Sequence, residues 1–231
     1  MNENIINKDA TAQNIHKLMK EFNLTVAEMQ SIFGFKKPTA IYKWIHGLST
    51  PTLDHLVVLA VLFGASINNI IAINEAALDK LALTYHEFKT PVKTIGLSNR
   101  KQLAIPSINT TATGRRIKRL MNGAGVTVQE VQEIFGFKTP QAIYKWLRGL
   151  SMPSIDNLLI LAAVLNVPVD EIIIVDVAII SSTTGRIISP QTNEPPMILS
   201  EMNHLSASSS VSRPYSDRNA TYYGKKTEAR R

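Results

Sequence analysis

Two sets of polar and cationic side chains, 102 residues apart, are the groups in this chain best suited to contact a ligand. Each set recurs at helical spacing, so its members share one face of a helix. The sets are Thr39, Tyr42, Lys43 and His46, and Gln141, Tyr144, Lys145 and Arg148. These side chains can donate hydrogen bonds, and several carry positive charge. They indicate recognition of a partner rather than catalysis.

The sequence also lacks the patterns that other kinds of site would need. No nucleophile–base pair, paired-carboxylate motif or phosphate-cradling glycine loop is present. Cysteine is absent, and the five histidines show no paired metal-ligand spacing. We therefore expect no enzyme activity, no metal and no cofactor. The absence of cysteine also favours a reducing, cytoplasmic location.

Both sets belong to a longer repeat. Residues 15–73 align without a gap onto residues 117–175, and about half of the positions are identical. Two copies at this period are too few for a solenoid, so they predict two small domains of one type. We expect an all-α protein with a flexible arm (1–10), domain 1 (11–75), a linker that is helical at its start (76–110), domain 2 (111–176) and a mostly disordered tail (177–231).

Five short helices are predicted in each copy. Thr11 and Thr113 are the expected N-caps of the first helix, and Thr25 with Glu28 forms a capping box at the second. The box recurs as Thr127 and Glu130, and Gly34 and Gly136 are expected to end this helix.

The third helix is expected to begin near Pro38 and Pro140, with Thr139 as a good N-cap in the second copy. Its apolar positions are expected to point inward, namely Ile41, Ile45 and Leu48, and Ile143, Leu147 and Leu150. Leu81 and Tyr85 are expected to pack a linker helix on domain 1. Two β-prone runs flank a predicted turn at 183–185.

The net charge of +7 favours a polyanionic partner. The excess does not lie in the domains, because residues 1–75 hold six basic and six acidic side chains and residues 111–176 hold seven and six. Recognition of nucleic acid would therefore depend on local patches. No signal peptide or membrane span is expected, because the longest apolar stretch is broken by polar and charged residues.

The repeated segment resembles the lambda-repressor-like, Xre-type family of helix-turn-helix DNA-binding regulators. The residues that carry this resemblance recur 102 positions on: Thr25, Glu28, Gly34, Ile41, Trp44, Gly47, Pro51 and the helix around Leu56–Ala60. The resemblance implies that the third helix enters the DNA major groove and that the second lies across the backbone. Val26 and Val128 depart from the family, because many members place a glutamine there for a phosphate contact.

The resemblance also implies a set of DNA-contacting residues. The base-reading positions map to Lys37, Thr39 and Lys43, and to Thr139, Gln141 and Lys145. His46 and Arg148 fall at phosphate-contacting positions, and Lys36 and Lys138 flank the groove entrance. Tyr42 and Tyr144 either touch phosphate or cover the edge of the tryptophan. Because the two sets differ, the copies are expected to read similar but non-identical half-sites.

The expected function is that of a sequence-specific transcription regulator that reads a bipartite site in double-stranded DNA. A flexible linker of about 39 residues would reach roughly 34 Å, about the spacing of half-sites on one face of DNA. The sequence leaves open a homodimer formed through the linker or tail, and any small-molecule effector is unknown. The alternative is a protein-interaction regulator of the antitoxin or phage-regulator type, in which one or both copies bind a protein.

Overall fold

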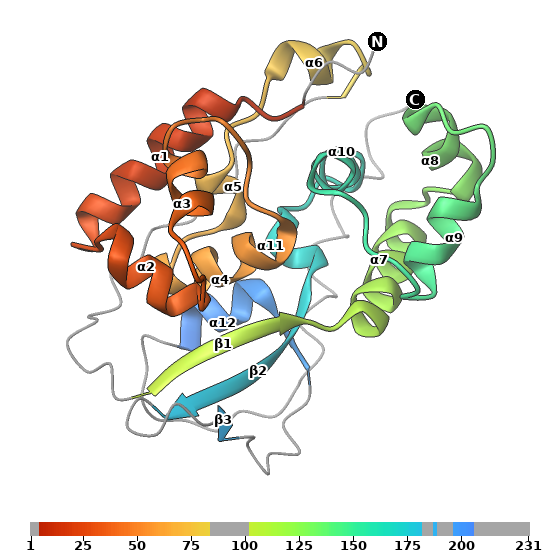
Figure 1. Cartoon of the computed structure of the whole chain (residues 1–231). Helices are drawn as coiled ribbons and strands as arrows, with labels where there is room; N and C mark the ends of the chain where they lie inside the picture. The colour runs from red at the N-terminus through yellow and green to blue at the C-terminus, as the bar shows by residue number, and fades with distance from the viewer. Residues whose placement is uncertain (1–4, 84–101, 182–186, 189–195, 206–231) are drawn as a thin grey trace.

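The computed structural model describes residues 5–83, 102–181, 187–188 and 196–205. The chain is mostly helical, and its helices form two units that lie side by side above a small sheet in the view of Figure 1. The predictions that concern Tyr85, the turn at 183–185 and residues 206–231 lie outside the described residues.

Each unit contains five helices in the same order. The first unit comprises α1 (Lys8–Glu21), α2 (Val26–Phe33), α3 (Thr39–Ile45), α4 (Leu53–Phe63) and α5 (Ile67–Ile70). The second comprises α7 (Thr110–Ala124), α8 (Val128–Phe135), α9 (Gln141–Leu147), α10 (Ile155–Leu165) and α11 (Val169–Ile172). From α8 onward, every helix of the second unit begins and ends 102 residues after its counterpart. The sequence repeat is therefore a structural repeat.

The predicted capping boxes are confirmed. Glu28 donates its backbone N–H to Thr25 Oγ1 (3.2 Å), and the Glu28 carboxylate accepts the Thr25 N–H (2.8 Å). Thr127 and Glu130 make the same two bonds at 3.2 and 2.7 Å. Each box satisfies backbone groups that the start of a helix leaves unpaired.

The predicted start of the first helix was wrong in both units. Asn7 caps α1 by accepting the Ala10 N–H at 3.0 Å, and Asn109 caps α7 by accepting the Ala112 N–H at 2.9 Å. Thr11 and Thr113 lie one turn later and are buried. Their hydroxyl oxygens accept the N–H groups of Ala72 and Ile174, both at 3.0 Å, and so fix the first helix to the chain that leaves the unit.

Residues 5–10 consequently do not form the predicted flexible arm. Ile5 and Ile6 are buried, and α1 already begins at Lys8. Ile6 forms an antiparallel bridge with Ile73, which brings the entry and exit of the first unit together.

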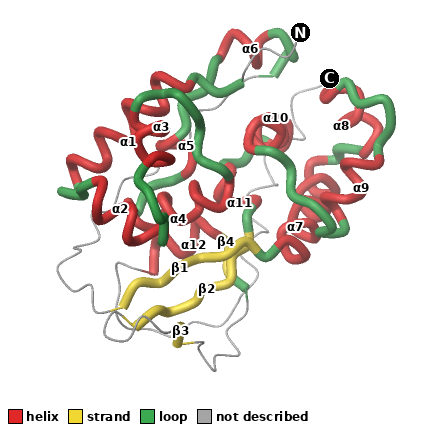
Figure 2. The backbone as a smooth tube through the Cα atoms, in the orientation of Figure 1, coloured by secondary structure: helices red, strands yellow, loops and turns green. Residues whose placement is uncertain are grey.

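A four-stranded antiparallel sheet joins the entry and exit of the second unit, and the chain is otherwise mostly helical, consistent with the all-α prediction. The sheet consists of β1 (Gln102–Ile108), β2 (Ile174–Ser181), β3 (Ile187–Ile188) and β4 (Met197–Ile198), and Figure 2 shows it in yellow. β1 pairs along β2, with Ile108 opposite Val175. These two residues are the counterparts of Ile6 and Ile73. The pairing of β2 with β3 confirms the two predicted β-prone runs.

Part of the predicted disordered tail is also ordered. Helix α12 (Leu199–Leu205) follows β4 and packs against both α4 and α11. Leu199 is fully buried, and its N–H donates to the Ile173 carbonyl at 2.9 Å. The predicted linker helix is short, because α6 spans only Glu75–Asp79, although Leu81 packs against the core as expected. Within the described part of the chain, every helix is too short or too polar to serve as a membrane span.

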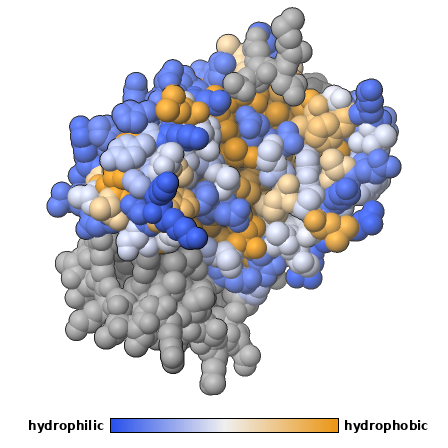
Figure 3. Space-filling view, viewed as in Figure 1, coloured by the Kyte–Doolittle hydropathy of each residue, from blue (hydrophilic) through white to orange (hydrophobic). Residues whose placement is uncertain are grey.

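The two units share one hydrophobic core, which the prediction of two domains on a flexible linker did not anticipate. Helices α5 and α11 meet at the centre of Figure 1, and β1 packs against α4 of the first unit. On the same face, hydrophilic residues cover the outer sides of the units and apolar residues gather between them (Figure 3). The units are therefore held by direct packing.

Reciprocal hydrogen bonds relate α5 and α11. Asn68 Oδ1 accepts the N–H of Val169, the first residue of α11, at 2.9 Å. Asp170, the counterpart of Asn68, accepts the N–H of Ile67, the first residue of α5, at 3.1 Å. Exchange of equivalent groups in this way is the mark of a two-fold, isologous contact. The two units are thus related by a local pseudo-two-fold axis at this interface.

Candidate nucleic-acid interface

The turn between α2 and α3 is braced by a glutamine. The Gln30 side-chain amide donates to the Phe35 carbonyl, and the Phe35 N–H donates to the Gln30 carbonyl, both at 3.0 Å. Gln132 and Phe137 form the same pair of bonds between α8 and α9. The residue that precedes each phenylalanine is a glycine with φ near +64° (Gly34 65°, Gly136 63°), a conformation that favours glycine.

Three aromatic rings fix the orientation of the third helix. Phe33, Phe35 and Trp44 lie with ring centroids 5.3 to 5.8 Å apart. The second unit repeats the cluster with Phe135, Phe137 and Trp146. Both tryptophans are buried, so the opposite face of α3 and of α9 must point to solvent.

All twelve predicted DNA-contacting residues are exposed: Lys36, Lys37, Thr39, Tyr42, Lys43, His46, Lys138, Thr139, Gln141, Tyr144, Lys145 and Arg148. For Thr39, Tyr42, Lys43 and His46 and their counterparts Gln141, Tyr144, Lys145 and Arg148, this exposure agrees with the outer face predicted for the third helix. Tyr42 and His46 stack on that face, with ring centroids 6.3 Å apart and planes at 10°. Their contact with DNA remains a prediction.

The start of α9 differs from the prediction. Pro38 and Pro140 occupy the cap positions of α3 and α9, and neither offers a side-chain hydrogen bond. Thr139 is therefore not the N-cap. Its hydroxyl donates instead to Gln141 Oε1 at 2.7 Å, which fixes the amide of Gln141 while leaving both amide N–H donors for a ligand.

Leu48 and Leu150 were predicted to point inward, and this was wrong. Leu48 is 72% exposed and Leu150 is 69% exposed. Each follows a glycine with φ near +70° (Gly47 69°, Gly149 70°) that ends the third helix, so the helical periodicity no longer applies to it. The Leu48 N–H donates to the Lys43 carbonyl at 2.9 Å, and the Leu150 N–H donates to the Lys145 carbonyl at 2.9 Å.

Helix α7 carries four cationic side chains, but only three of them are exposed. Arg115, Lys118 and Arg119 are exposed, but Arg116 is buried. The Arg116 guanidinium donates to the Glu171 carboxylate and to the Glu171 carbonyl, both at 2.9 Å. Arg116 therefore holds α7 against α11 and is not available to a ligand.

His55 is part of the aromatic cluster rather than a surface residue of α4. Its ring lies 5.1 to 5.4 Å from those of Phe33, Phe35 and Trp44. The Thr52 hydroxyl lies 2.8 Å from His55 Nδ1. Burial lowers the pKa of His55 below its usual value, and the nearby Asp54 opposes this shift.

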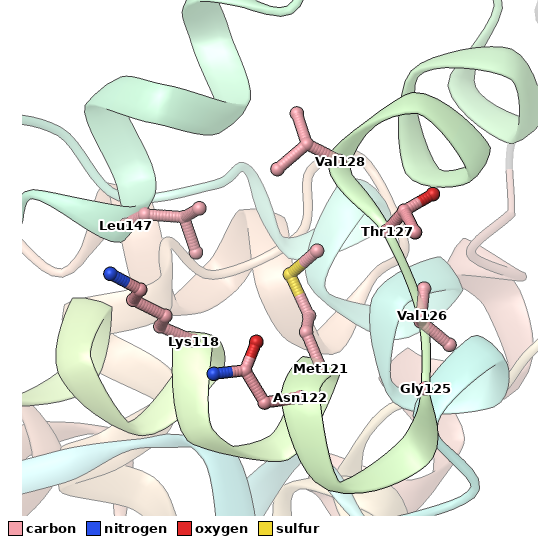
Figure 4. Close-up of a pocket in the computed structure, with 8 residues that line it drawn as sticks. All are labelled: Lys118, Met121, Asn122, Gly125, Val126, Thr127, Val128 and Leu147. Carbon is pink, nitrogen blue, oxygen red and sulfur yellow. The ribbon is translucent and has the colours of Figure 1, made fainter.

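An open hollow of about 380 Å³ lies on the second unit between α7, the following turn and α9 (Figure 4). Met121, Val128 and Leu147 give it a mostly apolar wall, and Lys118 and Asn122 stand at its edge. In the part of the chain that the structure describes, no group of three or more His, Cys, Asp or Glu side chains could hold a metal ion.

The second unit thus presents a capped helix, a glycine turn and a second helix with an exposed polar face. Residues 117–172 match the Helix-turn-helix family model. This helix-turn-helix match covers the second half of α7 and all of α8 to α11, and it supports the resemblance to Xre-type DNA-binding regulators. No curated protein and no solved structure matches the chain significantly.

Proposed function

We propose that the chain is a sequence-specific transcription regulator that reads a bipartite site in double-stranded DNA with two non-identical helix-turn-helix units. The proposal is supported chiefly by the helix-turn-helix match on the second unit together with the repetition of its exposed polar and cationic face on α3. Exposed lysine, threonine and glutamine side chains can reach base edges in the major groove without leaving a buried charge unpaired.

The two faces offer different donors to the bases. Lys37 of the first unit is replaced by Thr139 in the second, and Thr39 is replaced by Gln141. Lysine favours guanine O6 and N7, whereas glutamine favours adenine. The two half-sites are therefore similar, because Lys43 and Lys145 are shared, but they are not identical.

The pseudo-two-fold contact between α5 and α11 supports an inverted arrangement of these half-sites. A two-fold rotation makes α9 cross the DNA in the opposite direction to α3, as inverted half-sites require. Directly repeated half-sites would instead require two units related by a translation. Because the units share a core, the spacing between half-sites is set by packing and not by the reach of a linker.

The experiment begins with selection of duplexes from random-sequence DNA by the full chain. We expect two unlike inverted arms at one fixed spacing. Lys43→Ala and Lys145→Ala should each cost about 1–3 kcal/mol of binding free energy and reduce the slope of log K against log salt by about one. Lys17→Ala removes an exposed lysine of α1 that lies outside the predicted faces and serves as the charge-matched control. Wild-type affinity in the Lys43/Lys145 double variant would rule out these faces.

A protein-interaction regulator of the antitoxin or phage-regulator type is the second candidate. The observation that favours it is the near-balance of basic and acidic side chains in each unit, since a DNA-binding domain is usually more basic. Affinity purification from cells would distinguish the two candidates, because this one predicts a stable protein partner and no retained DNA.

A further inference from the structure

Among the described residues, the large hydrophobic side chains that are exposed are Tyr42, Leu48, Tyr144 and Leu150. They form two pairs at equivalent positions of the repeat, with the tyrosine in the middle of the third helix and the leucine just beyond its C-terminal end. A single exposed leucine is ordinary on a protein surface. Here, however, an exposed leucine stands at the same corner of both units, next to the predicted reading faces.

The backbone holds each leucine in place. The bond from the Leu48 N–H to the Lys43 carbonyl places the leucine beside the last exposed lysine of α3. Gly47 lies so close to α1 that an added Cβ would be 2.7 Å from Asp9 Oδ1, and one on Gly149 would be 2.5 Å from Thr111 Cα. The corner is therefore anchored against the first helix of its unit, and the leucine is presented in a fixed position.

Neither leucine contributes much to the core, since more than two thirds of each is exposed. Their apolar surface can stabilise the protein only when something covers it. The charges near each leucine indicate what could cover it. Exposed cations precede the leucines closely in the chain, Lys43 before Leu48 and Lys145 and Arg148 before Leu150, whereas Asp9 is an acidic residue that approaches Gly47. The complementary surface is therefore mainly anionic with apolar parts. Duplex DNA has this chemistry, because deoxyribose and thymine methyl groups lie between its phosphates.

We propose that Leu48 and Leu150 contact DNA, where they pack against deoxyribose or thymine methyl groups beside the helix that reads the bases. This inference rests on the proposed function and extends it to two residues outside the predicted contact set.

The test measures the affinity of the full chain for the duplex that the wild-type chain selects from random-sequence DNA, over a series of salt concentrations. We expect Leu48→Ala with Leu150→Ala to weaken binding on the order of tenfold, because apolar area is lost from the interface. The slope of log K against log salt should not change, since leucine releases no counterion. The melting temperature should be unchanged as well. Leu48→Met with Leu150→Met conserves the apolar volume and should restore near wild-type affinity.

The outcomes separate this inference from the proposed function. Wild-type affinity in the alanine double variant, with weak binding in the lysine double variant, would overturn the leucine contact and leave the function intact. Loss of a co-purified protein partner without any change in DNA affinity would show that a protein covers these corners. If the wild-type chain selects no duplex at all, the proposed function itself fails.

Discussion

Asn68 and Asp170 occupy equivalent positions of the two units, and each accepts a hydrogen bond from the first N–H of the other unit's fifth helix. The exchange is symmetric in its backbone partners but not in its chemistry. One acceptor is the neutral amide of Asn68, and the other is the carboxyl group of Asp170, a residue that is 2% exposed. The Ser66 hydroxyl also donates to Asp170, whereas the counterpart of Ser66 is Pro168.

Asp170→Asn should remove a pH dependence of stability. Burial raises the pKa of Asp170 to about 6, although the Ser66 hydroxyl and the Ile67 N–H act in the opposite direction. The folded state therefore binds a proton more tightly than the unfolded state, and the free energy of unfolding falls as pH rises from about 4 to 6. Above that range the buried charge costs on the order of 3 kcal/mol at most.

Urea unfolding of wild type and Asp170→Asn between pH 5 and 7.5 measures this effect. The amide oxygen of asparagine can still accept from Ser66 and Ile67, so the variant should gain relative stability as pH rises. A difference in unfolding free energy that stays constant over this range would contradict the assignment.

His55→Asn should have the opposite pH signature. The lowered pKa of His55 means that the neutral ring is favoured in the aromatic cluster, so its contribution to stability is present above pH 6.5 and is lost as pH falls below it. The variant introduces the residue that the second unit carries at the equivalent position, Asn157. Relative to wild type, its melting temperature should fall less between pH 7.5 and pH 5. An equal fall in both proteins would show that His55 does not titrate in this range.

Gly114→Ala should destabilise the second unit. An added Cβ would lie 2.3 Å from the Trp146 carbonyl oxygen and 2.9 Å from the Gly149 N, and both are backbone atoms that cannot move aside. We expect a loss of about 2 kcal/mol from this overpacking. Gly123→Ala in the same helix is the matched control, because Gly123 is exposed and alanine there should stabilise by roughly 0.5–1 kcal/mol. Thermal unfolding should therefore show shifts of opposite sign, and shifts of the same sign would contradict the close contact between α7 and α9.

Glu171→Ala should cost more stability than its partial exposure suggests. It leaves the buried Arg116 guanidinium without its carboxylate, and we expect a loss of about 3 kcal/mol. Ser200 of α12 donates to the other oxygen of the same carboxylate at 2.7 Å. Ser200→Ala removes a partly exposed hydrogen bond and should cost only about 1 kcal/mol. Equal effects on the urea midpoint would mean that the tail contact, and not the ion pair, determines the stability of this region.

Thr139→Val should weaken base preference in one half-site alone, provided that the proposed function holds. Valine has nearly the same shape as threonine but cannot donate to Gln141, so the Gln141 amide would be free to rotate. We expect discrimination at the base that Gln141 contacts to fall by about 1 kcal/mol, with the first half-site unaffected. Competition binding with single-base variants of the selected duplex measures base discrimination in each of the two half-sites. Loss of preference in both arms would contradict a local role for Thr139.

The features that the sequence predicted correctly are those with short-range causes. A threonine and a glutamate three residues apart can form the two capping-box hydrogen bonds with each other's backbone N–H, whatever the rest of the fold. The capping boxes at Thr25 and Thr127 could therefore be predicted. Leu48 was misplaced because helical periodicity was extended past Gly47, where the chain leaves the helix. Asn7 was missed because Thr11 offered a plausible cap four residues later.

The features that were missed depend on partners far along the chain. The acceptor role of Asp170 depends on Ser66 and Ile67, which are 104 and 103 residues away. No local sequence pattern indicates that the Asp170 side chain is buried. The ordered part of the tail is a similar case, because its polar composition indicated disorder, yet Leu199 reaches an apolar site against α11 and α4 that is formed only when the two units pack together.

The equivalent roles of Asn68 and Asp170 as acceptors have a consequence for how such an interface can vary. In a dimer of identical subunits, one codon change from asparagine to aspartate would appear on both sides of the axis. It would bring two acidic side chains into the same subunit interface. Here the two sides are encoded separately. The chain can therefore carry an acid on one side only, and each half can diverge without forcing the same change on the other.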